Sequence, residues 1–188
     1  FNKIGIIVGV VVVIVLAIFF MMQQKKEEPI KIGAIISLSG SASNLVDVRD
    51  GMILAADEVN SRGGENGRKL ELIIEDSKTD PHEGESAFKR IEAAHLPVLY
   101  VSTLSSVSMA LAPLAEQKEV VLVGLVVGNP GLTKRKKWIF RYYSSAETEV
   151  PPIISALSEL KVKKLGILYL NDEYGTSVFS LLKEEFEK

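Results

Sequence analysis

Apolar residues follow two alternating patterns along this chain after residue 29. Short, almost continuous apolar runs, which are typical of parallel strands covered on both faces, alternate with stretches whose apolar residues recur every three or four positions, as in helices packed on a sheet. The runs that predict strands are Ile30–Ile36, Leu70–Glu75, Val98–Val101, Val120–Val127, Trp138–Tyr142 and Lys164–Leu170. The alternation predicts an α/β fold with a doubly wound parallel sheet.

Three helices between these strands have readable starts. Asn44 is the expected N-cap of the first helix, and Asp80 followed by Pro81 opens the second, because Asx side chains cap helices and proline fits the first helical position. The third helix is expected to begin near Ser105 or Ser106. All three helices therefore start just beyond the carboxyl end of a predicted strand.

A second unit is expected after residue 145. The pattern restarts there with a helix opened by Pro151-Pro152, the strand Lys164–Leu170 and a helix after Gly175. So few residues cannot build a core of their own. We therefore expect residues 30–145 to form a first lobe and residues 146–188 to form the beginning of a second lobe that is cut short.

Residues 1–29 differ from the rest of the chain. Ile4–Met22 carries no charge over 19 positions, and a helix of that length spans about 28 Å, close to the thickness of a bilayer core. The segment lacks the small residues of a signal-peptide cleavage site, so an uncleaved membrane anchor is the preferred interpretation and a cleaved signal is the alternative. Lys25 and Lys26 after the run, against Lys3 before it, would by themselves place the domain inside the cell.

Composition excludes several classes of function. The 188 residues carry a formal net charge of −2 and no Cys, which excludes disulfides and thiolate metal sites and gives no reason to expect nucleic acid. His82 and His95 are too far apart on the second helix to predict a metal pair, and the basic loop Lys134–Lys137 is interpreted as a solvated turn. No phosphate-binding glycine loop and no nucleophile with a neighbouring base are recognisable, so we predict neither a cofactor nor an enzyme.

Several ordered pieces of the chain resemble the leucine/isoleucine/valine-binding protein family of type I periplasmic binding proteins, over about residues 30–188. The pieces are Ser39-Gly40, Asp50-Gly51, Gly63-Gly64, Asp80-Pro81, Leu104-Ser105-Ser106, Asn129-Pro130-Gly131-Leu132-Thr133, Phe140-Arg141 and Tyr174-Gly175. The resemblance implies two doubly wound lobes that close on a small ligand. It also implies an extracytoplasmic location, which we prefer to the orientation suggested by the flanking lysines.

The expected ligand site lies beyond the carboxyl ends of the strands, where ligands bind to open parallel sheets. Ser105 and Ser106 open a helix whose free N–H groups suit a carboxylate, and the resemblance implies that Ser105 contacts one; the alternative is that these serines only cap the helix. The resemblance adds Tyr174 from the second lobe. The predicted ligand-binding residues are Ser39, Asn44, Ser105, Ser106, Val127, Gly128 and Tyr174.

Two departures from the family pattern affect the ligand. Val127 and Gly128 stand where amino-acid binders usually show a small residue and a threonine, and Asn44 stands in a shortened loop where many relatives carry an aromatic residue. The expected function is capture of a small polar ligand, such as a branched-chain amino acid, an amide or a related carboxylate, for an ABC-type permease. The alternative is the ligand-binding ectodomain of a membrane-anchored sensory receptor.

Overall fold

A computed structural model describes residues 28–188 of the chain. The predicted membrane segment Ile4–Met22 lies outside the described residues. Within residues 28–188, every helix is too short or too polar to cross a bilayer.

Five parallel strands form one sheet in the order β2-β1-β3-β4-β5. They are β1 (Ile30–Ile36), β2 (Leu70–Asp76), β3 (Leu99–Thr103), β4 (Val121–Leu125) and β5 (Ile139–Tyr142). The chain first adds β2 on one side of β1 and then continues on the other side with β3, so the order reverses between β1 and β3. The expected parallel α/β sheet is confirmed, with strand ends within two residues of those predicted.

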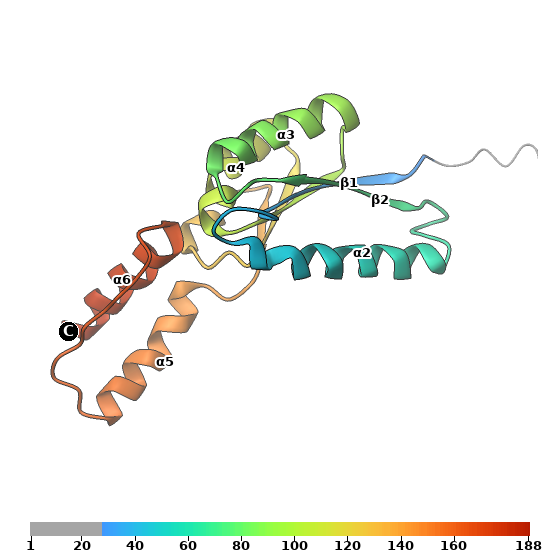
Figure 1. The fold of residues 1–188 in the computed structure, drawn as a ribbon. Coiled ribbons are helices and arrows are strands. Elements are labelled where there is room, and N and C mark those ends of the chain that lie inside the picture. The colour runs from blue at the N-terminus through green and yellow to red at the C-terminus, as the bar shows by residue number, and fades with distance from the viewer. Residues whose placement is uncertain (1–27) are drawn as a thin grey trace, which may run out of the picture.

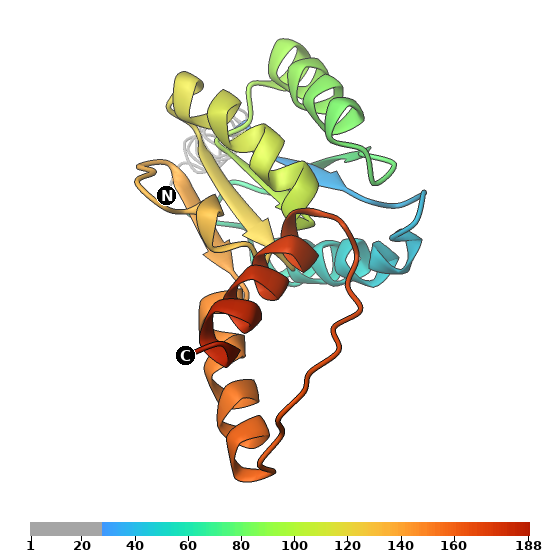
Figure 2. The ribbon, with the colours of Figure 1, turned by 90° about the vertical axis from the view of Figure 1, so that its left-hand side faces the viewer.

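Helices cover both faces of this sheet (Figures 1 and 2). On one face lie α3 (Pro81–His95) and α4 (Ser105–Lys118), which pack against each other, and on the opposite face lies α2 (Val46–Ser61). Two short 3-10 helices, η1 (Ser43–Leu45) and η2 (Pro130–Leu132), lie in the loops after β1 and β4. The sheet is therefore wound on both sides, as the sequence predicts.

The hydrophobic core lies between the sheet and the α3–α4 layer. Tyr100 stacks on Phe88 with ring centroids 4.2 Å apart, and both side chains are almost completely buried. Around them pack further buried residues of β1, α3, α4, β4 and β5, namely Ile35, Ala87, Ile91, Val107, Leu111, Ala115, Leu122 and Ile139. On the other face, Ala56 is the one buried residue of α2 and keeps 8% of its surface exposed. The α3–α4 layer thus forms the well-packed side of the sheet.

Residues beyond β5 form two helices, α5 (Ala146–Glu159) and α6 (Glu173–Phe186), which pack against each other. The predicted strand Lys164–Leu170 is wrong, because these residues form no strand in the described part of the chain. An extended segment needs a neighbouring strand to satisfy its backbone hydrogen bonds, and none of the five described strands lies beside it. Instead, Tyr169 stacks on Phe179 of α6 with centroids 4.5 Å apart.

Three predicted helix starts are also corrected. The helix expected after Gly175 begins at Glu173, before that glycine. Asn44 does not cap α2: it lies inside η1, and α2 begins at Val46 without a side-chain cap. The helix expected at Pro151-Pro152 begins earlier, at Ala146, because the backbone N–H of Ser145 donates to Thr148 Oγ1 (3.1 Å) and starts the helix there. The start of α3 is confirmed, since the Asp80 carboxylate accepts from the N–H groups of His82 and Glu83.

Candidate functional site

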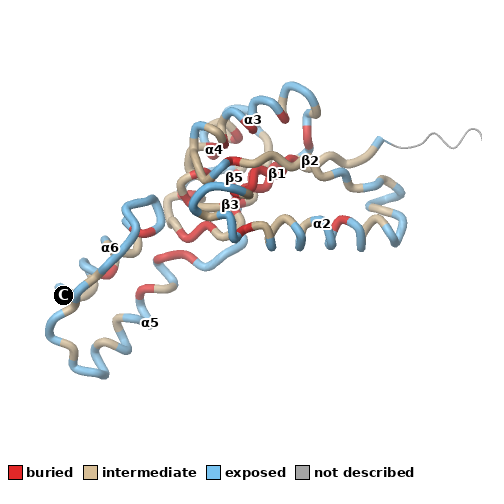
Figure 3. Tube along the Cα trace, viewed as in Figure 1, coloured by how far each residue is buried: buried red, intermediate tan, exposed pale blue. Residues whose placement is uncertain are grey.

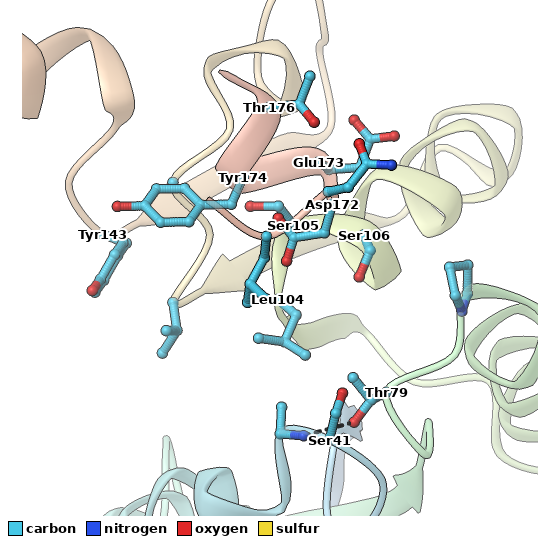
Figure 4. A pocket seen from close by; sticks show the side chains of 16 residues that line it. Ser41, Thr79, Leu104, Ser105, Ser106, Tyr143, Asp172, Glu173, Tyr174 and Thr176 are labelled. Atoms are coloured by element: carbon cyan, nitrogen blue, oxygen red, sulfur yellow. Dashed lines mark hydrogen bonds between the residues drawn. The ribbon is translucent and has the colours of Figure 1, made fainter. Parts of the chain in front are cut away.

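A cavity of about 890 Å³ lies at the carboxyl end of the sheet. It is lined by the loops after β1, β2, β3 and β4 and by the start of α6; the start of α4 lies with α6, and Ser41 and Thr79 lie across from them (Figure 4). Because the strand order reverses between β1 and β3, the cavity lies at the topological switch point, where open parallel sheets bind ligands. We call this space the cavity below.

Strained backbone marks the loops that form these walls. Thr79, Leu104 and Val126 all line the cavity, and their φ angles are 64°, 66° and 54°. Positive φ is unfavourable for non-glycine residues, most of all for a β-branched valine, and costs of order 1–3 kcal/mol each. Strain of this kind persists where the surrounding structure holds it, and such residues cluster at functional sites.

Asp76, at the end of β2, fixes the loop after β1. Its Oδ1 accepts from the N–H groups of Leu38 (2.9 Å) and Ser39 (3.2 Å), and its Oδ2 accepts from the Ser39 hydroxyl (2.5 Å). Partial burial alone would raise the pKa of Asp76, but the hydrogen bonds from the Ser39 hydroxyl and from three backbone N–H groups lower it below its ordinary value. The carboxylate is therefore charged and holds the loop that supplies Ser41 to the cavity.

Thr79 ties the same two loops together nearer the cavity. Its hydroxyl donates to the backbone oxygen of Ser39 (2.9 Å) and accepts from the N–H of Ala42 (3.2 Å). Gly40 allows the close approach, since its φ is +85° and a Cβ there would lie 2.3 Å from the Lys78 oxygen. Hydrogen bonds thus join the loops after β1 and β2 into one wall.

The start of α4 supplies polar groups to the opposite side of the cavity. Ser105 and Ser106 are its first two residues and line the cavity, and no side chain caps this helix. The N–H groups of an uncapped first turn and the positive end of the helix dipole attract an anion. Ser105 is 4% exposed, and its Oγ accepts from the N–H of Asn129 (3.2 Å), which leaves the hydroxyl proton able to donate.

Asn129 joins the sheet lobe to α6. Its Nδ2 donates to the backbone oxygen of Glu173 (2.7 Å), and its own backbone oxygen accepts from Arg141 Nη1 (3.0 Å). Together with the bond to Ser105, these contacts hold the start of α6 beside the start of α4. Asn129 itself does not line the cavity.

The α6 wall contains Asp172, Glu173 and Tyr174. The Tyr174 hydroxyl donates to Glu149 Oε2 (2.7 Å). Burial, then the hydrogen bond to Glu149 and the nearby negative charge, raise the pKa of Tyr174 to about 12, so this phenol keeps its proton at neutral pH. Among the described residues, those lining the cavity include two acids and no Lys, Arg or His, which gives this wall a negative charge.

Four of the seven predicted site residues line the cavity: Ser105, Ser106, Gly128 and Tyr174. The other three lie elsewhere. Ser39 is exposed and bonded to Asp76, Asn44 is exposed in η1, and Val127 is completely buried in the hydrophobic core. Val126, the residue before Val127, lines the cavity in its place.

Sequence reasoning missed the β2 loop and most of the α6 wall. Thr79 could have been found, because the rule that selects loops after β1, β3 and β4 applies equally to β2. Asp172 and Glu173 directly precede the predicted Tyr174, and an acidic first turn is a common helix start signal. Tyr143 directly follows β5 and could have been found by the same rule, whereas Leu170 carries no such signal, since it enters the wall through tertiary packing.

Residues 28–188 contain no candidate metal site, because no group of three or more His, Asp or Glu side chains there could hold an ion. His82 is exposed and His95 is half-buried, at opposite ends of α3.

Residues 29–188 match the family described as Periplasmic binding protein. The leucine-, isoleucine-, valine-, threonine- and alanine-binding protein of Pseudomonas aeruginosa is 24% identical over 163 residues, which is 85% of this chain and 44% of that protein. The chain thus spans less than half the length of this relative.

Solved structures share the fold. The branched-chain amino acid transporter substrate-binding protein LivJ of Streptococcus pneumoniae, in complex with isoleucine, is 26% identical with a TM-score of 0.78, over 85% of this chain and 47% of that one. A solute-binding protein of an ABC transporter from Rhodopseudomonas palustris, in complex with 3,4-dihydroxybenzoic acid, is 20% identical with a TM-score of 0.75, over 85% and 44% of the two chains.

Proposed function

Because the chain belongs to the periplasmic binding protein family, we propose that it captures a small solute in the cavity and delivers it to an ABC-type importer. One observation carries the proposal: the cavity at the switch point is lined both by the sheet lobe and by the start of α6. A ligand held between two such walls favours the state in which they are close. It thereby shifts the population toward a closed form that a permease can recognise.

The proposed ligand is a small carboxylate or zwitterion, such as a branched-chain amino acid, an amide or a related carboxylate. The uncapped start of α4 with Ser105 and Ser106 suits a carboxylate, and the acids Asp172 and Glu173, which also line the cavity, suit an ammonium group. The relatives support this range, since one binds isoleucine and another dihydroxybenzoic acid. We place leucine and isoleucine first because the more similar of these two structures is the isoleucine complex.

The cellular location of this domain is part of the same proposal. The family assignment supports a domain outside the cytoplasm, and Ile4–Met22 would anchor it to the membrane. A chain starting at Lys26 should then be soluble and keep its fold. Aggregation of that shorter chain, together with solubility of the longer one without detergent, would contradict the anchor.

A sensory receptor ectodomain is the second candidate, because an uncleaved anchor at Ile4–Met22 suits a receptor as well as a binding protein. The sequence that follows the second lobe in the complete protein separates the two. A further membrane span with a signalling module would favour the receptor, and its absence would favour transport.

The site is tested by Ser105→Ala in the full-length protein, with L-isoleucine and L-leucine as probes in calorimetry. Loss of a hydrogen bond to a charged group should cost about 1.5–3 kcal/mol, roughly ten- to a hundredfold in affinity. Ser86→Ala, at an exposed position of α3, is the matched control and should leave affinity unchanged.

A purely structural role for Ser105 predicts another pattern. The hydroxyl also accepts from Asn129, so the substitution could lower the melting temperature and leave the affinity of folded protein unaltered. That result would remove Ser105 from the binding site. Failure of the unmodified protein to bind any small carboxylate or zwitterion would overturn the proposed ligand class.

A further inference from the structure

Gly128 lies against the ring of Tyr174. A Cβ built on Gly128 would lie 2.4 Å and 2.5 Å from two ring carbons, well inside the 3.5–4.0 Å at which carbon atoms make favourable contact. Any side chain at position 128 would therefore have to displace the ring. The two residues belong to different parts of the fold, since Gly128 follows β4 and Tyr174 is in the first turn of α6.

The ring cannot move aside freely, because its far end is held. The Tyr174 hydroxyl donates to Glu149 Oε2 (2.7 Å) on α5. The backbone oxygen of Gly128 accepts from the N–H of Ala146, at the start of the same helix (2.9 Å). Gly128, Tyr174 and Glu149 thus form one chain of contacts from the β4 loop through α6 to α5.

Backbone conformation does not explain the glycine. The described glycines with positive φ are at positions 40, 63, 64 and 67, so Gly128 has a φ that any residue can adopt. Position 128 is glycine because the ring of Tyr174 occupies the space that a side chain would need. This matters because Gly128 and Tyr174 both line the cavity (Figure 4 shows the ring of Tyr174 at its edge).

We propose that Gly128 is a positioning residue for the ligand cavity that acts through Tyr174: the missing side chain lets the tyrosine ring pack on the β4 loop and form this part of the wall. The ring takes the place of any side chain at position 128. The wall therefore offers a ligand an aromatic surface and no hydrogen-bonding group from that position, which suits a ligand with an apolar body. The inference rests on the proposed function, since it takes the cavity as the ligand site.

A double-mutant cycle in the full-length protein tests the inference, with Gly128→Ala, Tyr174→Ala and the double variant. Each is measured for L-isoleucine affinity by calorimetry and for melting temperature without ligand. Gly128→Ala alone should weaken binding at least tenfold and lower the melting temperature, because the methyl group displaces the ring. In the Tyr174→Ala background the same change should alter affinity less than twofold and leave the melting temperature unchanged, because no clash remains.

Gly51→Ala is the matched control. Gly51 has no atom within 4 Å of its built Cβ, and it lies in α2 away from the cavity. This substitution should leave L-isoleucine affinity unchanged. A tenfold loss in this control would show that the assay responds to any added methyl group, and the inference would fall.

The remaining outcomes separate the inference from the proposed function. Additive effects of the two substitutions on affinity and melting temperature, in a protein that binds L-isoleucine, would overturn the role of Gly128 and leave the proposed function intact. A non-additive melting temperature with normal affinity in Gly128→Ala would make the contact structural only and also overturn the inference. No binding of L-isoleucine by the unmodified protein would count against the proposed ligand, while the melting cycle would still decide whether Gly128 positions the ring.

Discussion

The sheet lobe, residues 30–145, and the region that follows it, residues 146–188, have similar helices but very different packing (Figure 3). Every member of the buried core cluster lies between Ile35 and Ile139. In the later region, Ala146, Val150 and Leu182 are the buried hydrophobic residues, whereas Leu168 is fully exposed. Short helices are marginal in water by themselves and take most of their stability from packing an apolar face, and α5 and α6 cover few apolar side chains. The cavity therefore joins a well-packed wall to a weakly packed one.

The largest predicted effect is a core substitution in the sheet lobe. Leu111 is completely buried in α4, so Leu111→Ala should lower the free energy of unfolding by about 2–5 kcal/mol in denaturant titrations. Leu182→Ala in α6 is the counterpart in the second region and should change this value by much less. Equal losses would show that both regions unfold as one core and would break the comparison.

The next effect concerns Asp76, whose carboxylate holds the loop after β1 through hydrogen bonds. Asp76→Asn removes the charge that accepts from Leu38, Ser39 and Lys78, and should cost about 1.5–3 kcal/mol of stability in the same titrations. Asp57→Asn, at an exposed position of α2, is the control and should be nearly neutral. A neutral Asp76→Asn would mean that the two loops hold their shape without this carboxylate.

Acid should act on the same group. The folded state lowers the pKa of Asp76 below its ordinary value of 3.8, so the unfolded chain binds a proton first as pH falls. The stabilising contribution is complete above the ordinary pKa and is lost as pH drops through the folded pKa. Between pH 7 and pH 2, the gap in melting temperature between the native chain and Asp76→Asn should narrow below about pH 4. A constant gap would contradict the assignment.

The smallest effect is expected at the contact between α6 and α5. Tyr174→Phe removes the hydrogen bond to Glu149 and should lower the stability of residues 146–188 by about 1 kcal/mol. Hydrogen exchange should then speed up in α5 and α6 and stay unchanged in the sheet lobe. Tyr142→Phe, at an exposed tyrosine, is the control. Faster exchange throughout the chain would show that the contact also supports the sheet.

Much of the sheet lobe could be predicted from the sequence, because its signals are local. Continuous apolar runs indicate buried parallel strands, and Asp80-Pro81 defines the start of α3 through a cap that the structure contains. The predicted strand Lys164–Leu170 had the same apolar pattern as the others. It does not form, because pairing depends on a neighbour that no local pattern reveals.

The candidate site could be predicted only in part, for a related reason. Ser105 was predicted from its place at a helix start beyond a strand end, and Gly128 and Tyr174 were predicted from the family resemblance. The prediction named Val127 where Val126 lines the cavity. The positive φ of Val126 turns the chain there, and side-chain patterns do not reveal such a turn. The close contact of Gly128 with Tyr174 joins residues far apart in sequence, and only the fold brings them together.

The account depends most on the contrast between the two regions that form the cavity. Hydrogen exchange on the 188-residue chain, read peptide by peptide, tests it most directly. Amides of residues 146–188 should open early, because few apolar side chains there are covered, while amides of β1, β3 and β4 should exchange only on global unfolding. Equal protection in both regions would mean that residues 146–188 complete a single compact domain, and it would contradict the division into a stable lobe and a weakly packed wall.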